Sequence, residues 1–454
     1  MMLLMWIIMV VLMCFSTIAQ IGTRFPSERK VVIDPVTGVE LIFLTSTPSG
    51  DSKIYPTHNQ WTSDGKWIVF RSKRVKDEAI AVNEKSGEIV QVTEGGYQGT
   101  LNVARKSMKL YYMRRSDNKQ SYEIIEVNLT KLFADSKAGT LKPASEYQRV
   151  CGTTPPEFRA SGDMALDADE EWIWFRVGRD EAMKHLPEGT KIEENFGPRN
   201  MGAGPGGIAG MNIQTGEIKY VVSVPFQVGH IQSNPWVPGQ IVFCWETGGK
   251  SPQRTWIVNS DGTGLRSLYP ESPYEWVTHE VVISPDEVAF SIMGHRKIPG
   301  TSENVSVGND VHGVNPGQEI EWGPSGTREK PTGLAIVNIE SREMIIAGQL
   351  PYGSGFWHVT GSADGRFVAG DNFAREIYLI DRYTHEMILL SAGHKPTARD
   401  HPHPTFSTDG TKILIQSAML SEDEKSMNIC IIPIPEEWLK RKYEFNNYIK
   451  IQKE

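Results

Sequence analysis

The sequence predicts an all-β fold, a seven-bladed β-propeller, from three observations. A turn-and-strand pattern recurs seven times, a further strand signal follows each copy, and an extra hairpin near the N-terminus can complete the last copy. The 454-residue chain is 39% hydrophobic with 42 glycines and 27 prolines, which suits a large core with many turns. We therefore expect a signal peptide at residues 1–19, one propeller at 20–440 and a C-terminal tail at 441–454.

The repeat is a turn of the Ser-x-Asp-Gly type followed by an apolar run. Its copies are SDGKWIVF (63–70), KSMKLYYM (106–113), ADEEWIWF (168–175), VPGQIVFC (237–244), SPDEVAFS (284–291), SADGRFVA (362–369) and STDGTKILI (407–415). Second strand signals follow, such as AIAVNEKSGEIVQVT from Ala79 and IIEVNLTKL from Ile124. Tight turns flanked by β-branched and aromatic residues predict antiparallel strands. Radially arranged four-stranded blades fit this spacing better than a sandwich.

The seventh copy is incomplete, because its last strand signal, NICIIPI from Asn428, has no partner after it. A hairpin signal, KVVIDPVTGVELIFL at 30–44, stands before the first copy. Since an unpaired strand edge is a liability, we expect this hairpin to complete the last blade and close the ring. The alternative is an independent N-terminal hairpin.

Two stretches interrupt the rhythm, at residues 178–210 and 295–332. Both are rich in Gly, Pro and Asn and lack strand periodicity, so they are predicted to be long loops on one face of the propeller. Such loops are either functional lids or flexible surface loops without a role in function.

The first twenty residues contain an apolar run followed by small residues, which predicts a signal peptide and an exported, periplasmic or secreted protein. An uncleaved N-terminal anchor is the alternative, and no other membrane contact is expected. Cys151, Cys244 and Cys430 are scattered and are predicted to be core thiols rather than a disulfide framework. A net charge of −8 without a Lys/Arg run argues against nucleic-acid binding. The oligomeric state is left open.

Histidines recur just before the repeated turn or at the start of a blade's innermost strand. They are His58, His230, His279, His358, His401 and His403. Equivalent positions of successive blades converge on the central channel, so we expect these rings at one mouth of it. His401 and His403, at i and i+2, would lie on one side of an extended strand, and with a third ring such as His279 they predict a metal site. A single histidine in a strand is more often a hydrogen-bonded structural residue than a metal ligand. Glu280 either orients a ligand or points outward.

The segments HIQSNPW, IVFCWETGG, QRTWIVNSDGTGLR, THEVVISPD and HPHPTFSTDG, with YPTHNQWTSDGKWIVF before them, resemble oligogalacturonate lyases, which are pectin-degrading seven-bladed propellers. The resemblance runs from about residue 55 to residue 417. It implies a divalent cation, typically manganese, on His279, His401 and His403, and it implies that His230 is the general base. Arg254 matches an arginine of the family pattern that is suited to pairing with a carboxylate.

The chain also departs from the family pattern. Ala398 stands where the family has a metal-binding glutamine, so the fourth ligand is expected to be water, substrate, His358 or Asp400. A family arginine that helps to bind substrate has no clear counterpart, and Arg199 is the candidate for its place.

The resemblance implies a polysaccharide lyase that acts on an acidic oligosaccharide and cleaves 4-linked uronides by metal-assisted β-elimination, which leaves unsaturated uronide products. The cation would stabilise charge on the C6 carboxylate while His230 removes the C5 proton. Three alternatives remain. They are a non-catalytic periplasmic scaffold, an accessory propeller of a peptidase, for which no GxSxG motif is found, and a lyase of a different uronide-containing glycan.

Overall fold

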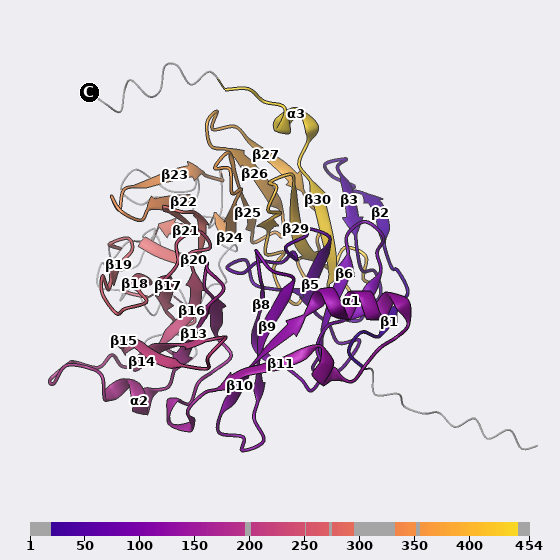
Figure 1. Cartoon of the computed structure of the whole chain (residues 1–454). Coiled ribbons are helices and arrows are strands. Elements are labelled where there is room, and N and C mark those ends of the chain that lie inside the picture. Colours follow the sequence, from indigo (N-terminus) through magenta and orange to yellow (C-terminus); the bar gives the residue numbers. More distant parts are fainter. Residues whose placement is uncertain are drawn as a thin grey trace, which may run out of the picture.

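The computed structural model describes residues 20–195, 201–249, 251–271, 275–294, 332–350 and 355–443. In these ranges the strands form seven antiparallel sheets arranged around one axis, and the predicted seven-bladed β-propeller is confirmed (Figure 1). Some predictions fall outside these ranges in whole or in part: the signal peptide, the middle of the 178–210 loop with Arg199, the 295–332 loop and the end of the tail.

The first four blades follow one another along the chain, and each runs from an inner to an outer strand. Blade 1 contains β4 (Ser52–Lys53), β5 (Trp67–Arg71), β6 (Ala79–Asn83) and β7 (Ile89–Gln91), with β1 (Arg24–Phe25) at its outer edge. Blade 2 contains β8 (Gln98–Val103), β9 (Lys109–Arg115), β10 (Tyr122–Asn128) and β11 (Gln148–Thr153). Blade 3 contains β12 (Met164–Leu166), β13 (Trp172–Val177), β14 (Ala203–Asn212) and β15 (Ile218–Phe226). Blade 4 contains β16 (Val228–Ser233), β17 (Gln240–Trp245), β18 (Thr255–Asn259) and β19 (Arg266–Ser267).

The last three blades complete the ring. Blade 5 contains β20 (Glu275–Ser284), β21 (Glu287–Gly294), β22 (Gly333–Asn338) and β23 (Met344–Gly348). Blade 6 contains β24 (Phe356–Gly361), β25 (Phe367–Asn372), β26 (Ile377–Asp381) and β27 (Met387–Ser391). Blade 7 contains β28 (Thr405–Phe406), β29 (Lys412–Ser417) and β30 (Asn428–Pro433), followed outward by β3 (Glu40–Phe43) and β2 (Lys30–Ile33). Each of the seven sequence repeats therefore leads into the second strand of a blade.

The N-terminal hairpin closes the ring as predicted. Ile42 pairs with Ile431 and Phe43 with Cys430, so β3 lies beside the last strand of the chain (Figure 1). Residues from the two ends of the chain thus share one sheet and leave β30 with no free edge.

The core consists of apolar layers between neighbouring blades. Alternate residues of a strand face opposite sides of its blade, and both sides are buried. On β5, Ile68 and Phe70 pack toward blade 7, whereas Trp67 and Val69 pack toward blade 2. This explains why the repeats are near-continuous apolar runs rather than alternating ones. Cys151, Cys244 and Cys430 are buried free thiols, as predicted.

Two details of the predicted organisation are wrong. The strand signal from Ile124 ends at Asn128, whose side chain accepts a hydrogen bond from the backbone N–H of Lys131 and caps helix α1 (Leu129–Ala138). The predicted loop at 178–210 begins with helix α2 (Arg179–Met183) and ends inside β14. Gly210 lies in that strand, paired with Trp174, and only glycine fits there because the Trp174 ring lies 2.3 Å from where a Cβ would stand.

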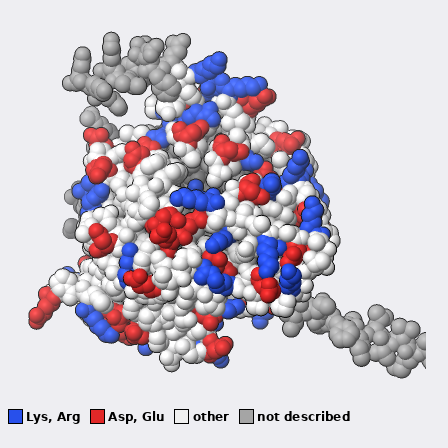
Figure 2. Space-filling view, in the orientation of Figure 1, with Lys and Arg blue, Asp and Glu red and all other residues white. Residues whose placement is uncertain are grey.

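The remaining elements are short. They are helix α3 (Glu436–Leu439) and the 3-10 helices η1 (Ala144–Glu146) and η2 (Pro156–Phe158). None of the helices in the described ranges has the length and apolar character that crossing a lipid bilayer requires. On the face seen in Figure 2, Lys and Arg side chains are interspersed with Asp and Glu.

Candidate functional site

Five histidines and a tyrosine meet near the axis, and we call this group the histidine cluster. His358 on β24 is at its centre, with its ring centroid 4.1 Å from that of His279, 5.2 Å from His401 and 3.9 Å from His403. The Tyr55 ring, from blade 1, lies 5.1 Å from His230 and 5.3 Å from His403. The cluster therefore draws side chains from blades 1, 4, 5, 6 and 7.

The backbone directs several of these rings inward by leaving regular strand geometry. His230, His279 and His403 have φ angles of 49°, 56° and 54°, in the left-handed region. In β16 and β20 these residues coincide with register shifts, between Gly229 and Gln232 and between Thr278 and Val281. Bulges of this kind re-aim side chains and are frequent beside functional sites, as is local backbone strain.

His401 and His403 do not lie on an extended strand, contrary to the prediction. They precede β28, and the left-handed conformation of His403 breaks the alternation that the i, i+2 argument assumed. Both rings still reach His358. Ala398, at the position of the family glutamine, packs against Ala418 and Met427 in a small apolar cluster separate from the main core.

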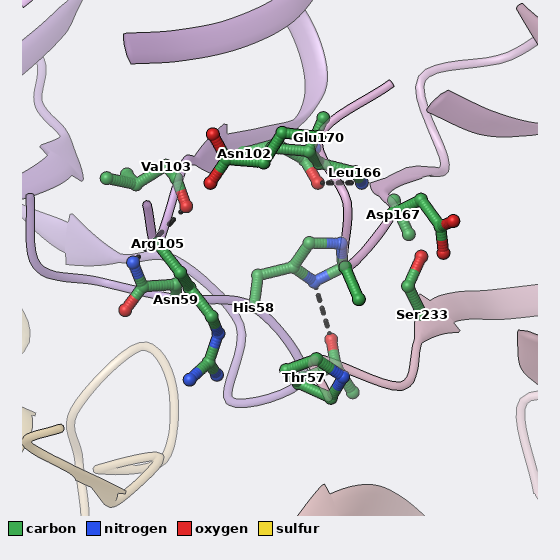
Figure 3. A pocket seen from close by; sticks show the side chains of 13 residues that line it. Thr57, His58, Asn59, Asn102, Val103, Arg105, Leu166, Asp167, Glu170 and Ser233 are labelled. Atoms are coloured by element: carbon green, nitrogen blue, oxygen red, sulfur yellow. Dashed lines mark hydrogen bonds between the residues drawn. The ribbon is translucent and has the colours of Figure 1, made fainter. Parts of the chain in front are cut away.

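His58 makes no ring contact with the other predicted histidines among the described residues, although His230 acts electrostatically on its pKa. Its Nδ1 lies 2.7 Å from the Thr57 hydroxyl (Figure 3), and its Nε2 lies 2.8 Å from the Met164 carbonyl oxygen. Burial lowers the pKa of His58 to about 4. Blade 1 contributes Tyr55, three residues earlier, to the cluster instead of His58. The Tyr55 hydroxyl is 2.5 Å from Nδ1 of His279.

The first half of the cluster, which we call the metal side, comprises His279, His358, His401 and His403. Asp371 on β25 is fully buried among them. It accepts hydrogen bonds from the backbone N–H of His358 at 2.7 Å and of His403 at 3.2 Å. Its carboxylate also lies 3.2 Å from Nδ1 of His358 and 3.6 Å from Nδ1 of His401. Ligand atoms of His358, Asp371 and His401 all lie within 4.8 Å of one another.

Three imidazoles on the metal side, those of His279, His358 and His403, have lowered pKa values, which favours their neutral form. Burial lowers the pKa of His358 to about 3, and burial also lowers the pKa values of His279 and His403. Burial would raise the pKa of Asp371, but the neighbouring His358 and His401 hold it well below its ordinary value. Neutral imidazole and ionised carboxylate are the forms that bind a metal.

The residues present fit a divalent cation. Nε2 of His279, Nδ1 of His401 and Nδ1 of His403 are buried without a hydrogen-bond partner in the described part of the chain. Buried polar atoms are normally paired, and an unpaired imidazole nitrogen is a ready metal ligand. These are the three histidines that the resemblance implied, whereas the group whose ligand atoms converge within 4.8 Å joins His401 to His358 and Asp371 instead.

The other half, which we call the base side, surrounds His230. Nε2 of His230 is 3.3 Å from a Glu246 oxygen, and its Nδ1 is 3.4 Å from a Glu280 oxygen. Arg254 donates from Nε to Glu280 at 2.8 Å and lies 3.7 Å from Glu246. Glu280 therefore points inward and contacts His230, which excludes the outward alternative. Arg254, only 3% exposed, is in a buried ion pair rather than a surface one.

Charge sets the proton affinities on the base side. Burial would lower the pKa of His230, but the hydrogen bond and charge of Glu280, with Glu246 adding to them, raise it above its ordinary value. Burial would raise the pKa of Glu280, but Arg254 and His230 lower it to about 2. His230 is thus a stronger base than a free imidazole.

Three residues of this site were not found from the sequence: Tyr55, Asp371 and Glu246. Asp371 had a signal, because it is a charged residue at the end of an apolar repeat strand, in FVAGDN. Tyr55 lies within a quoted motif but carries no repeat signal of its own.

No family model matches the chain. Two curated proteins are similar to it. An oligogalacturonide lyase of Pectobacterium atrosepticum is 21% identical over 61% of this chain and 66% of its own length, and an oligogalacturonate lyase of Dickeya dadantii is 20% identical over 85% and 91%.

Two solved structures share the fold. An oligogalacturonate lyase in complex with manganese has a TM-score of 0.68 at 17% identity, covering 93% of this chain and all of its own. The oligogalacturonate lyase of Vibrio parahaemolyticus has a TM-score of 0.68 at 18% identity, covering 92% of this chain and all of its own. The family that this chain resembles, in sequence and in fold, is therefore that of the oligogalacturonate lyases, as its histidine-bearing motifs predicted.

Proposed function

We propose that the chain is a lyase that cleaves 4-linked uronides in pectic oligosaccharides by metal-assisted β-elimination. The observation that carries the proposal is the division of one histidine cluster into a base side and a metal side. The ring centroids of His230 and His279 are 6.4 Å apart, so one sugar that contacts both rings would meet a basic imidazole and a set of metal-binding nitrogens together.

β-Elimination breaks the C5–H and C4–O bonds of the uronide and forms a C4–C5 double bond. A divalent cation held by His279, His401 and His403, with His358 and Asp371 beside them, would stabilise the negative charge that develops on the C6 carboxylate. His230 takes the C5 proton, and the carboxylates of Glu246 and Glu280 stabilise the imidazolium that results. The oxygen at C4 leaves with the bonding electrons and takes a proton from water. Arg254 keeps Glu280 ionised and in place.

The test is product analysis with the purified protein, manganese and short oligogalacturonides. We expect unsaturated uronides, which absorb in the near ultraviolet, and we expect a chelator to suppress their formation. Saturated products would indicate hydrolysis and contradict the proposal. So would the absence of unsaturated product from every uronide-containing glycan tried with added manganese.

The substrate is part of the same proposal. Because Ala398 replaces the family glutamine, a panel should include glucuronate-containing glycans beside pectic ones, and preference for the pectic fragments is expected. We also propose that the protein is exported, on the apolar run at residues 1–19. Recovery of the mature protein only from the cytoplasmic fraction would contradict export.

A further inference from the structure

A second polar cavity lies beyond the histidine cluster, lined by inner segments of blades 1 to 4 (Figure 3). Its lining includes Thr57, His58, Asn102, Arg105, Asp167 and Ser233. None of the lining residues belongs to the histidine cluster. Strand β16 links the two sites, because it carries His230 near its start and Ser233 at its end. Three strand positions span at most about 10 Å.

Arg105 gives this cavity a cation without a counter-ion. Among the described residues no carboxylate forms an ion pair with its guanidinium, whose Cζ lies 5.5 Å from the centre of the Trp236 ring. The Arg105 side chain lines the cavity and is exposed to solvent. A guanidinium without a carboxylate partner is free to form charge-assisted hydrogen bonds with a bound anion.

The two carboxylates of the lining are engaged elsewhere. Asp167 accepts from the backbone N–H of Gly239 at 2.9 Å, and Glu170 accepts from the backbone N–H of Lys106 and the hydroxyl of Ser107, both at 2.6 Å. Neither of them neutralises Arg105.

Ser233 provides a second, independent sign of a ligand. Its hydroxyl oxygen is buried without a hydrogen-bond partner in the described part of the chain. In Figure 3, Arg105 and Ser233 lie on opposite sides of His58, and Asp167 lies near Ser233. The cavity is therefore polarised, with a guanidinium at one side and a hydroxyl and a carboxylate at the other.

The size of the cavity limits what it can hold. Its volume is about 40 Å³. At about 10–15 Å³ for each water molecule, that is room for about three waters, which suits a carboxylate and a neighbouring hydroxyl but not a buried disaccharide.

We propose that this cavity is a second uronate subsite, in which Arg105 binds a sugar carboxylate while Ser233 and Asp167 bind an adjacent hydroxyl. The inference rests on the proposed function for the choice of sugar. A carboxylate and a guanidinium form charge-assisted hydrogen bonds, and a sugar hydroxyl both donates and accepts, which matches the polarity of the cavity.

The test is calorimetric titration of the monosaccharide galacturonate without added metal. The full chain carrying His401→Ala, which alters only the histidine cluster, is compared with the same chain carrying Arg105→Ala as well. We expect the second change to weaken galacturonate binding about 10- to 100-fold, the range for losing a charged hydrogen bond. Equal affinity in the two proteins would overturn the subsite.

Three controls make the result specific. Arg115→Ala removes another exposed arginine that lies 5.4 Å from an aromatic ring, that of Tyr122, and should leave the affinity unchanged. Galactose, which lacks the carboxylate, should not bind. Inorganic phosphate should bind more weakly than galacturonate, and equal or tighter phosphate binding would overturn the assignment to a uronate.

The monosaccharide has no bond to eliminate and the titration needs no metal. Absence of lyase activity would therefore overturn the proposed function and leave this titration interpretable. Loss of the Arg105 effect would overturn the subsite while lyase activity stands.

Discussion

The two sides of the histidine cluster bury the same kind of side chain and give it opposite proton affinities. On the base side, His230 lies between Glu246 and Glu280 and its pKa is raised. On the metal side, burial dominates and lowers the pKa values of His279 and His358. Burial acts to lower the pKa of His230 and of His358 alike, but the two glutamates beside His230 outweigh burial, whereas Asp371 beside His358 does not.

This difference separates two chemical tasks within one channel. Metal binding requires imidazoles without protons on their ligand nitrogens, and the pKa values of His279, His358 and His403 are lowered. Proton abstraction is favoured by a more basic imidazole, and the pKa of His230 is raised. The predictions below test whether the two tasks can be removed one at a time.

The largest expected effect is the loss of activity in His230→Ala with retention of metal. Removing a general base typically lowers the rate about 10²- to 10⁴-fold, so kcat/KM should fall by at least about 100-fold. Manganese content, measured by elemental analysis, should stay stoichiometric. His401→Ala should lose both metal and activity.

His185→Ala is the matched control, because that ring stacks on Tyr220 away from the cluster. It should keep both metal and activity. If His230→Ala loses metal, or His401→Ala keeps it, the division into two sides is wrong.

The next effect concerns the pH dependence. His230 must be neutral to act as a base, and its pKa is raised, so activity should be lost as the pH falls through that raised pKa. Glu280→Gln removes the group that raises it most, so the acid limb of kcat/KM should move to lower pH. An acid limb that stays in place or moves to higher pH would contradict this account.

Glu280→Gln also leaves buried Arg254 without its closest partner, and breaking a buried pair costs about 3–5 kcal/mol. Glu246→Gln is therefore the second variant, since Glu246 is the more distant of the two carboxylates from Arg254. It should shift the acid limb in the same direction by a smaller amount. The control is Glu287→Gln. Glu287 pairs with Arg382 between blades 5 and 6, so this change should leave the acid limb unchanged.

The fold was predictable because its signals are local and repeated. Each Ser-x-Asp-Gly turn carries its own hydrogen bonds, as where the Ser362 hydroxyl donates to Asp364, and each precedes a strand buried on both faces. The errors arose where one residue overrode the pattern. Asn128 begins a helix with a side-chain cap, and Gly210 looks like loop but is required by the packing of Trp174.

The site was predictable only in part, because residue type is visible in a sequence and side-chain direction is not. His58 interacts electrostatically with His230, but its ring makes its hydrogen bond to the Met164 carbonyl oxygen rather than turning to the other histidines. Asp371 and Tyr55 were missed, because their role comes from ring closure, which brings blades 1 and 6 to the same axis. The left-handed turns at His230 and His279 likewise have no signal in the residue type.

The smallest expected effect sharpens the metal side through Tyr55. Its hydroxyl is 2.5 Å from Nδ1 of His279, which leaves Nε2 of that ring without a partner and free to bind a cation. A residue that orients a ligand typically contributes about 10- to 100-fold in metal affinity. Because phenylalanine keeps the ring contacts with the histidines, we expect Tyr55→Phe to fold normally and to bind Mn²⁺ about tenfold more weakly, at the low end of that range.

The measurement is a competition titration with a metal-binding dye, beside Tyr378→Phe as the control. Tyr378 is on β26 and its hydroxyl bonds to Glu376, just before that strand, so its loss should leave the manganese affinity unchanged. Unchanged affinity in Tyr55→Phe would mean that Tyr55 only fills space between the two sides. A tenfold loss with an unchanged acid limb would instead show that Tyr55 acts on the metal side alone, because His230 reaches its carboxylates without the phenol.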